Sequence, residues 1–139
     1  MNVLVDTSVW SLALRRRPRD LNSGEKAIVF ELAELINEGR ARIIGLVRQE
    51  LLSGIRAPGQ FAKLQGILRS FPDEPLSTGD YEAGAVAANQ CISKGLAVSV
   101  SDTLICAVAQ SRGWGIFSTD PDFKRYASVL VLTLHAVRK

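Results

Sequence analysis

Asn2-Val3-Leu4-Val5-Asp6-Thr7-Ser8 opens the chain with a short apolar run that ends at a carboxylate and two hydroxyls. An uninterrupted apolar run of this length is typical of a strand buried on both faces, as in a parallel sheet. An apolar helical pattern starts at Val9, so the run predicts a strand that leads directly into a helix. In open parallel sheets, sites form beyond the carboxyl ends of the strands, which is where Asp6 stands.

The composition is that of an ordinary globular chain, and we expect a single domain over residues 1–139. Hydrophobic residues make up 47% and charged residues 22% of the sequence, in the usual range for globular domains. No apolar run approaches the length of a bilayer span, and the first residues lack a basic n-region and a cleavage site. We therefore expect a cytoplasmic protein, with Cys91 and Cys106 reduced in the core.

Short apolar runs alternate with helical patterns along the whole chain. This alternation predicts a mainly parallel sheet with helices on both faces. The predicted strands are residues 2–5, 42–46, 115–118 and 129–132, with a further edge strand near residue 76. The predicted helices are residues 7–17, 23–38, 47–53, 61–68, 78–94 and 101–112. In the last of these helices, the Ser101 hydroxyl is expected to cap the start and Asp102 to lie in the first turn.

Five carboxylates lie just after predicted strands or at the start of the following helices. Asp6 follows the first strand, and Glu50 lies one turn into the helix after the second. Asp102 opens a later helix, and Asp120 and Asp122 follow the strand at 115–118. Each alone could be a cap, turn or surface residue. Because right-handed crossovers keep successive strand ends on one edge of a sheet, we expect all five to reach one pocket.

Such a cluster predicts a metal site. Crowded carboxylates repel one another and cannot all stay ionised without a counter-charge. No Lys or Arg is adjacent to Asp6 or Asp102 in sequence, so Mg²⁺, with Mn²⁺ as the alternative, is the natural partner for these oxygens. The site suits phosphodiester hydrolysis by a metal-activated water, with a spare carboxylate taking the proton. Neighbouring hydroxyls are expected to orient ligands or waters, namely Thr7, Ser8, Ser101 and Thr119.

Other chemistries fit the sequence poorly. The one histidine, His135, rules out a nuclease that relies on two histidines, and we expect it at the surface or on an edge strand. No glycine-rich phosphate loop follows a predicted strand, which argues against an NTPase or a dinucleotide enzyme. Ser8 and Ser101 have no histidine–carboxylate system to activate them as nucleophiles.

The basic residues are compatible with a polyanionic partner without requiring one, since the net charge is only +3. Arg15, Arg16 and Arg17 form part of the densest basic cluster, and the simpler interpretation is a solvated helix end. Together with Lys124 and Arg125, these three are candidate contacts for RNA phosphates.

Four segments in order over nearly the whole chain carry a resemblance to a known family. They are Val3-Leu4-Val5-Asp6-Thr7-Ser8-Val9-Trp10, Glu50-Leu51-Leu52-Ser53-Gly54, the segment from Gly95 through Ser101-Asp102-Thr103-Leu104-Ile105, and Ser118-Thr119-Asp120-Pro121-Asp122-Phe123. Together they resemble the motifs of PIN-domain ribonucleases, especially the VapC-like toxins of type II toxin–antitoxin systems.

The resemblance implies a three-layer α/β/α sandwich around a mainly parallel sheet of four to five short strands. It implies a Mg²⁺- or Mn²⁺-dependent endoribonuclease that slows translation, a cognate VapB-like antitoxin and a homodimer. By the same resemblance, Asp6 and Asp102 are metal ligands and Glu50 is a ligand or activates water. Whether Asp120 or Asp122 is the fourth ligand stays open, with a slight preference for Asp120.

Two alternative functions remain at this stage. The first is a PIN-like RNA-processing or DNA-directed nuclease without an antitoxin, which genomic context would distinguish. The second is a non-enzymatic receiver-like module with an acidic pocket. A receiver needs a lysine at a late strand end, whereas the late strands here end in Ser118-Thr119 and Leu134-His135.

Overall fold

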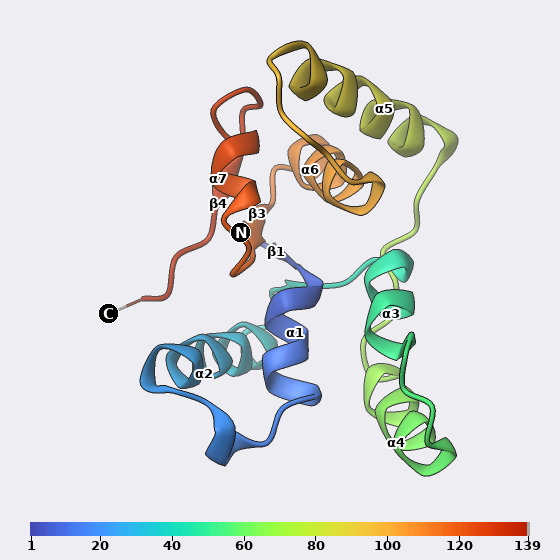
Figure 1. Cartoon of the computed structure of the whole chain (residues 1–139), viewed down its shortest axis with the longest axis vertical. Helices are drawn as coiled ribbons and strands as arrows, with labels where there is room; N and C mark the ends of the chain where they lie inside the picture. The colour runs from blue at the N-terminus through green and yellow to red at the C-terminus, as the bar shows by residue number, and fades with distance from the viewer. Residues whose placement is uncertain (139) are drawn as a thin grey trace.

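The computed structural model describes residues 1–138 (Figure 1). Its centre is a four-stranded parallel sheet in the order β2-β1-β3-β4. The strands are very short: β1 is Val3–Val5, β2 is Ala41–Arg42, β3 is Gly115–Phe117 and β4 is Thr133–Leu134. Every residue of β1 and β3 is buried, which explains the uninterrupted apolar runs of these two strands.

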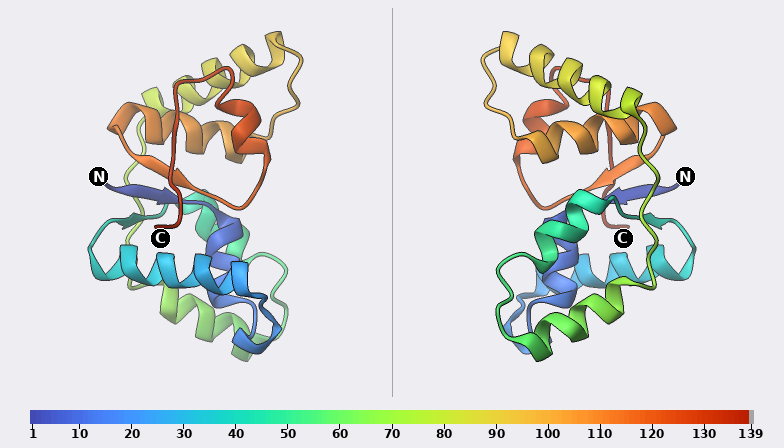
Figure 2. Two further views of the ribbon diagram at one scale, coloured as in Figure 1. Left: turned by 90° about the vertical axis from the view of Figure 1, so that its left-hand side faces the viewer. Right: turned by 90° about the vertical axis from the view of Figure 1, so that its right-hand side faces the viewer.

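Helices cover both faces of the sheet, so the predicted α/β/α fold is confirmed (Figure 2). One layer holds α1 (Thr7–Leu14), α2 (Ser23–Asn37), α3 (Gly45–Leu52) and α4 (Pro58–Leu68), with a 3₁₀ turn at Pro18–Asp20 after α1. The opposite layer holds α5 (Thr78–Ser93), α6 (Val100–Arg112) and α7 (Asp122–Tyr126). Within the described range, none of the helices has the length and apolarity needed to cross a bilayer.

The hydrophobic core forms where α1 and α6 pack against β1 and β3. Trp10 of α1 is buried, and its indole nitrogen donates a hydrogen bond to the carbonyl of Val5 at 3.2 Å. Cys91 and Cys106 are buried and unpaired, as predicted. Burial raises the pKa of the Cys106 thiol to about 12, so this side chain is an inert core group.

Local capping signals place most helix starts correctly. Asn22 with Glu25, and Ser77 with Asp80, form reciprocal capping boxes at the starts of α2 and α5. The expected cap of α6 is wrong by two residues, because the side chain of Ser99, not Ser101, accepts the Asp102 backbone N–H at 3.1 Å.

Two predicted strands are wrong in extent. The chain at 42–46 leaves the sheet after β2, makes a single bridge from Ile43 to Asp73, and enters α3 at Gly45. Short apolar runs do not distinguish a buried strand from a buried helix start, and this run contains both. The last strand is β4, not residues 129–132, because Leu130 packs in the core after α7 while Val131 is 85% exposed.

Smaller corrections concern segment ends. Helix α1 stops at Leu14, three residues earlier than predicted, and α4 begins at Pro58, where its missing N–H costs nothing. The extended segment near residue 76 forms no strand, so the described sheet has four strands rather than five. Phe30, which fits the apolar spacing of α2, is 66% exposed, because that helix buries only a narrow stripe.

The connector between α4 and α5 is fastened to the end of α6 by Arg112. Its guanidinium donates to both carboxylate oxygens of Asp80 (2.9 and 3.0 Å), to Glu74 (3.2 Å) and to the Pro75 carbonyl (3.1 Å). Asp80 is 8% exposed, and the hydrogen bonds from Arg112 hold the pKa of its carboxyl well below the usual range. This cluster sets how the α5–α6 pair sits against the sheet.

Candidate metal centre

The candidate site lies where the strand order reverses. The chain passes from β1 to β2 on one side and reaches β3 on the other side of β1, so the carboxyl ends of β1 and β3 form a switch point, the usual place of a site in open α/β sheets. Val5 pairs with Phe117, which brings Asp6 and Ser118, the next residue of each strand, side by side.

Three of the five predicted carboxylates form a compact group at this edge. Asp102, Asp120 and Asp122 each offer an oxygen within 4.8 Å of the other two, and all three are half-buried. Asp102 lies in the first turn of α6, whereas Asp120 and Asp122 come from the loop after β3 and the start of α7. Segments that are distant in sequence therefore bring three negative charges together.

Asp6 joins this group through serine hydroxyls. Ser118 and Ser8 donate to Asp6 Oδ2 at 2.7 and 2.9 Å, and the Asp120 backbone N–H donates to the Ser118 hydroxyl at 3.0 Å. Asp6 stands at the N-cap of α1, but its side chain makes no capping hydrogen bond and is only 7% exposed. Its carboxylate is thus held in place for another partner.

Glu50 lies outside the compact group of three, and its position is set by one hydrogen bond. The hydroxyl of Thr7, the first residue of α1, donates to Glu50 Oε1 at 2.7 Å. Because Thr7 follows Asp6 directly, this bond holds the Glu50 carboxylate near the Asp6 side of the site.

The electrostatics of the site leave negative charge uncompensated. Burial raises the pKa of Asp102, as do the charges of Asp6 and Asp120, while hydrogen bonds from Tyr126 (2.8 Å) and Ser99 offset part of the rise. Asp122 differs, because it forms an ion pair with Arg125. A set of half-buried oxygen ligands with unmatched charge fits a hard divalent cation.

The predicted hydroxyls divide into two kinds. Thr7 and Ser8 donate directly to carboxylates of the site. Thr119 contributes its backbone N–H, which donates to Ser8 at 3.0 Å, and Ser101 lies 3.4 Å from Ser99 rather than against a carboxylate.

Two functional candidates were missing from the sequence prediction. Ser118 stands beside Thr119 in the fourth motif, and its place directly after a buried strand is a signal that could have identified it. Tyr126 gave no such signal, because its contact with Asp102 spans 24 residues and depends on the docking of α7. His135 hydrogen-bonds Glu31 at 2.6 Å rather than any of the five predicted carboxylates.

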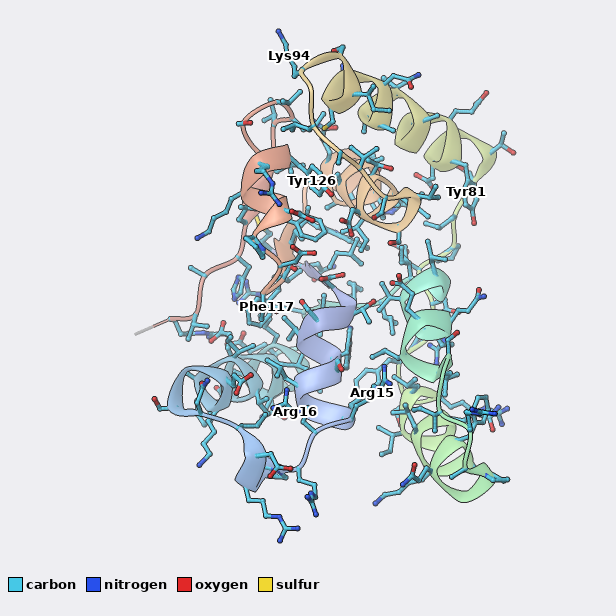
Figure 3. The ribbon with its side chains drawn as sticks, in the orientation of Figure 1. Arg15, Arg16, Tyr81, Lys94, Phe117 and Tyr126 are labelled. Atoms are coloured by element: carbon cyan, nitrogen blue, oxygen red, sulfur yellow. The ribbon has the colours of Figure 1, made fainter. Side chains whose placement is uncertain are left out.

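The predicted basic contacts lie in two separate places. Lys124 and Arg125 are exposed on α7, the helix that also carries Asp122, whereas Arg15, Arg16 and Arg17 are exposed beyond the end of α1. Figure 3 shows Arg15 and Arg16 beside α1. Arg17 pairs with Asp20 at 3.2 Å, and Arg16 lies 3.9 Å from Glu25.

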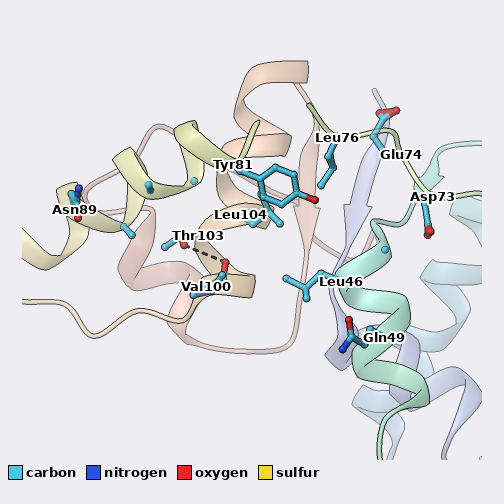
Figure 4. Close-up of a pocket in the computed structure, with 14 residues that line it drawn as sticks. Leu46, Gln49, Asp73, Glu74, Leu76, Tyr81, Asn89, Val100, Thr103 and Leu104 are labelled. Carbon is cyan, nitrogen blue, oxygen red and sulfur yellow. Dashed lines mark hydrogen bonds between the residues drawn. The ribbon is translucent and has the colours of Figure 1, made fainter. Parts of the chain in front are cut away.

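An apolar groove of about 740 Å³ lies between α3 and the α5–α6 pair (Figure 4). Leu46, Tyr81, Val100 and Leu104 are among its lining residues, and Val100 is 82% exposed. None of the five predicted site carboxylates lines it.

Comparison with known proteins gives one family and a set of similar structures. Residues 3–129 match the PIN domain. FitAcB from Neisseria gonorrhoeae is 22% identical with a TM-score of 0.73, over 96% of both chains. VapBC2 from Rickettsia felis, bound to a DNA fragment from its promoter, is 18% identical with a TM-score of 0.72, over 97% of this chain and 98% of that one. VapBC-1 from nontypeable Haemophilus influenzae is 15% identical with a TM-score of 0.71, over the full length of both. Among curated protein sequences, none gives a significant match.

Proposed function

This chain belongs to the PIN domain family, which is generally one of nucleases, and on that basis we propose that it is a metal-dependent endoribonuclease and the toxin of a toxin–antitoxin pair. The observation that carries this proposal is the meeting of Asp6, Asp102, Asp120 and Asp122 at the switch point between β1 and β3. We propose further that it acts as a single PIN domain in the cytoplasm, where its cleavage of RNA would slow translation.

In this proposal Asp6, Asp102 and Asp120 hold Mg²⁺ or Mn²⁺. When bound, the cation lowers the pKa of the attacking water and stabilises charge on the phosphate oxygens. Ser8 and Ser118 keep Asp6 oriented, and Tyr126 does the same for Asp102. We assign to Glu50, whose carboxylate accepts the hydrogen bond from Thr7, the role of accepting a proton from water.

We assign the fourth position to Asp120 rather than Asp122. The charge of Asp122 is already matched by Arg125, so part of its attraction for a cation is used within α7. Asp120 forms no ion pair within residues 1–138, and its Oδ1 accepts the Asp122 backbone N–H at 2.9 Å, which leaves its second oxygen for a metal. Asp122 then supports the site from α7.

Removal of divalent metal tests the proposal directly. Purified protein treated with EDTA should cleave no RNA, and added Mg²⁺ or Mn²⁺ should restore cleavage, because the carboxylates alone cannot activate water. Mapping of cleavage sites in total RNA with and without Mg²⁺ measures this. Full cleavage in the presence of EDTA would exclude the mechanism.

Ser118→Ala should weaken metal binding without removing a ligand. Loss of the hydroxyl leaves Asp6 with the hydrogen bond from Ser8 alone and leaves the Asp120 backbone N–H without its acceptor. Loss of such an orienting partner typically costs about 10- to 100-fold in metal affinity. The Mg²⁺ concentration for half-maximal cleavage should therefore rise, with activity recovering at high Mg²⁺. Ser93→Ala, at the exposed end of α5, is the matched control. An unchanged Mg²⁺ dependence would remove Ser118 from the site.

We propose a VapB-like antitoxin as the protein partner and a homodimer as the assembly. The support is the similarity to the chains of VapBC2 and VapBC-1, together with the apolar groove, since exposed apolar hollows commonly mark protein interfaces. Expression of the wild type should arrest growth, and co-expression of a small protein encoded next to it should relieve the arrest. Normal growth would favour the alternative of an RNA-processing nuclease. The receiver-like alternative is not favoured, because the chain belongs to the PIN domain family.

A further inference from the structure

A second charged feature lies at the far end of α1 from Asp6. We call it the basic cleft: about 540 Å³ between the end of α1, the α3–α4 loop and α4. It is lined by five exposed cations and by no Asp or Glu; the cations are Arg15, Arg16, Arg17, Arg56 and Lys63. Figure 3 shows Arg15 beside α1 on the side that faces α3 and α4.

Helix stabilisation does not account for this charge. Arg15 to Arg17 follow the carbonyl end of α1, where cations are favourable, but Arg56 directly precedes Ala57, the N-cap of α4. A cation at the amino end of a helix opposes the helix dipole. Within the part of the chain that the structure describes, Arg15, Arg56 and Lys63 form no ion pair. Of the five cations of the cleft, Arg15, Arg56 and Lys63 therefore contribute positive charge that no acidic side chain of residues 1–138 pairs with, whereas Arg16 and Arg17 are paired with Glu25 and Asp20.

The basic cleft and the carboxylate site are connected along one seam. Helices α1 and α3 pack together, and the Thr7 hydroxyl at the start of α1 donates a hydrogen bond to Glu50 in the last turn of α3. Their far ends, at Leu14 and at the Gly54–Arg56 loop, line the cleft. The eight residues of α1 span about 12 Å at 1.5 Å per residue, a length that a single-stranded RNA backbone crosses in a few nucleotides.

We propose that the basic cleft binds backbone phosphates of the RNA a few nucleotides away from the scissile bond, so that the substrate lies along the α1–α3 seam. This inference rests on the proposed ribonuclease function and adds Arg56 and Lys63 to the RNA contacts. Arginine suits the role, because its guanidinium binds phosphate oxygens in pairs. An acidic segment of a protein partner is the competing occupant, but the cleft leads to the site of phosphodiester chemistry, which favours RNA.

The test compares the double variant Arg56→Ala/Lys63→Ala with the control Lys94→Ala, all in an Asp6→Asn background that binds RNA without cutting it. Lys94 is exposed beyond the end of α5, at the other end of the molecule (Figure 3). The dissociation constant of a long single-stranded RNA should rise several-fold in the double variant alone. Its salt dependence should flatten by about 1.4 in log–log slope, because each lost contact to single-stranded RNA removes about 0.7.

A second measurement separates this inference from the proposed function. With Asp6 intact, the double variant should cleave an oligonucleotide too short to reach the basic cleft with unchanged kcat and KM, and should show a higher KM only on long RNA. Equal RNA affinity and equal salt slope in the double variant and Lys94→Ala would overturn the inference. The inference would also be overturned if the double variant bound the antitoxin more weakly but bound RNA with unchanged affinity. If the wild type cleaves no RNA, the proposed function fails. The comparison of RNA affinities still shows whether the basic cleft binds RNA.

Discussion

Replacing Asp6 or Asp102 by asparagine is expected to reduce RNA cleavage by roughly 100- to 1,000-fold or more, because a bound metal supplies several kcal/mol of transition-state stabilisation and each 1.36 kcal/mol is a factor of ten. Asparagine keeps the shape of the side chain and can still accept the hydrogen bonds from Ser118 or Tyr126. The charge that attracts the cation is what the variant lacks. Cleavage rates at saturating Mg²⁺, and growth of cells that express each variant, measure the effect.

Asp102→Asn should also stabilise the metal-free protein at neutral pH. The folded pKa of Asp102 lies above the ordinary value of about 3.9, so the folded state prefers the protonated form and loses stability as the pH rises through the folded pKa. At a pH above the folded pKa of Asp102, the wild type carries this whole penalty and the asparagine variant carries none. Its melting temperature in EDTA should exceed that of the wild type, and the gap should close below about pH 4.

The matched control is Glu82→Gln, which removes the charge of an exposed glutamate on α5, away from the sheet edge that carries the site and from the basic cleft. It should cleave RNA at the wild-type rate. Added Mg²⁺ should raise the melting temperature of the wild type and of this control, but not that of Asp6→Asn or Asp102→Asn. Undiminished cleavage by purified Asp6→Asn protein would contradict both the ligand assignment and the mechanism.

Arg112→Ala is expected to be the most destabilising change outside the apolar core, at roughly 2–4 kcal/mol, because it leaves the buried carboxylate of Asp80 without its charged partner. It also releases Glu74 and the Pro75 carbonyl, so the connector before α5 loses its attachment to α6. For a chain of this size, the loss corresponds to roughly 6–12 °C in melting temperature. Thermal and urea unfolding at pH 7 measure it.

The pH dependence identifies the cause. The folded pKa of Asp80 is depressed, so the stability from this pair is fully present above the unfolded pKa of about 3.9 and disappears as the pH falls through the folded pKa. The wild type should lose stability steeply below about pH 4, and Arg112→Ala should lose less over that range. Arg69→Ala, which removes an exposed arginine after α4, should leave stability at pH 7 nearly unchanged. A similar small loss of stability in Arg112→Ala and Arg69→Ala would show that the Arg112 cluster does not stabilise the fold.

The fold class could be predicted from local signals, because a strand that is buried on both faces of a sheet is apolar at every position. For that reason the strands Val3–Val5 and Gly115–Phe117 are apolar throughout. The capping boxes at Asn22 and Ser77 fix two helix starts through hydrogen bonds between residues that are only three apart in the sequence. The ends of β2 and β4 could not be predicted, because the same apolar residues pack equally well as strand, bridge or helix start. Ile43 is a bridge and Leu130 packs in the core outside any strand for tertiary reasons alone.

From the sequence we predict that five carboxylates reach one edge of the sheet, since successive parallel strands bring their carboxyl ends to one edge. Their arrangement depends on the packing of the helices: Asp102, Asp120 and Asp122 form a compact group, Asp6 joins it through Ser118, and Glu50 lies outside the group, hydrogen-bonded to Thr7 beside Asp6. Tyr126 and the basic cleft belong to the same category. Each depends on where α7 or α4 docks, and docking is set by the packing of distant side chains, which no local pattern encodes.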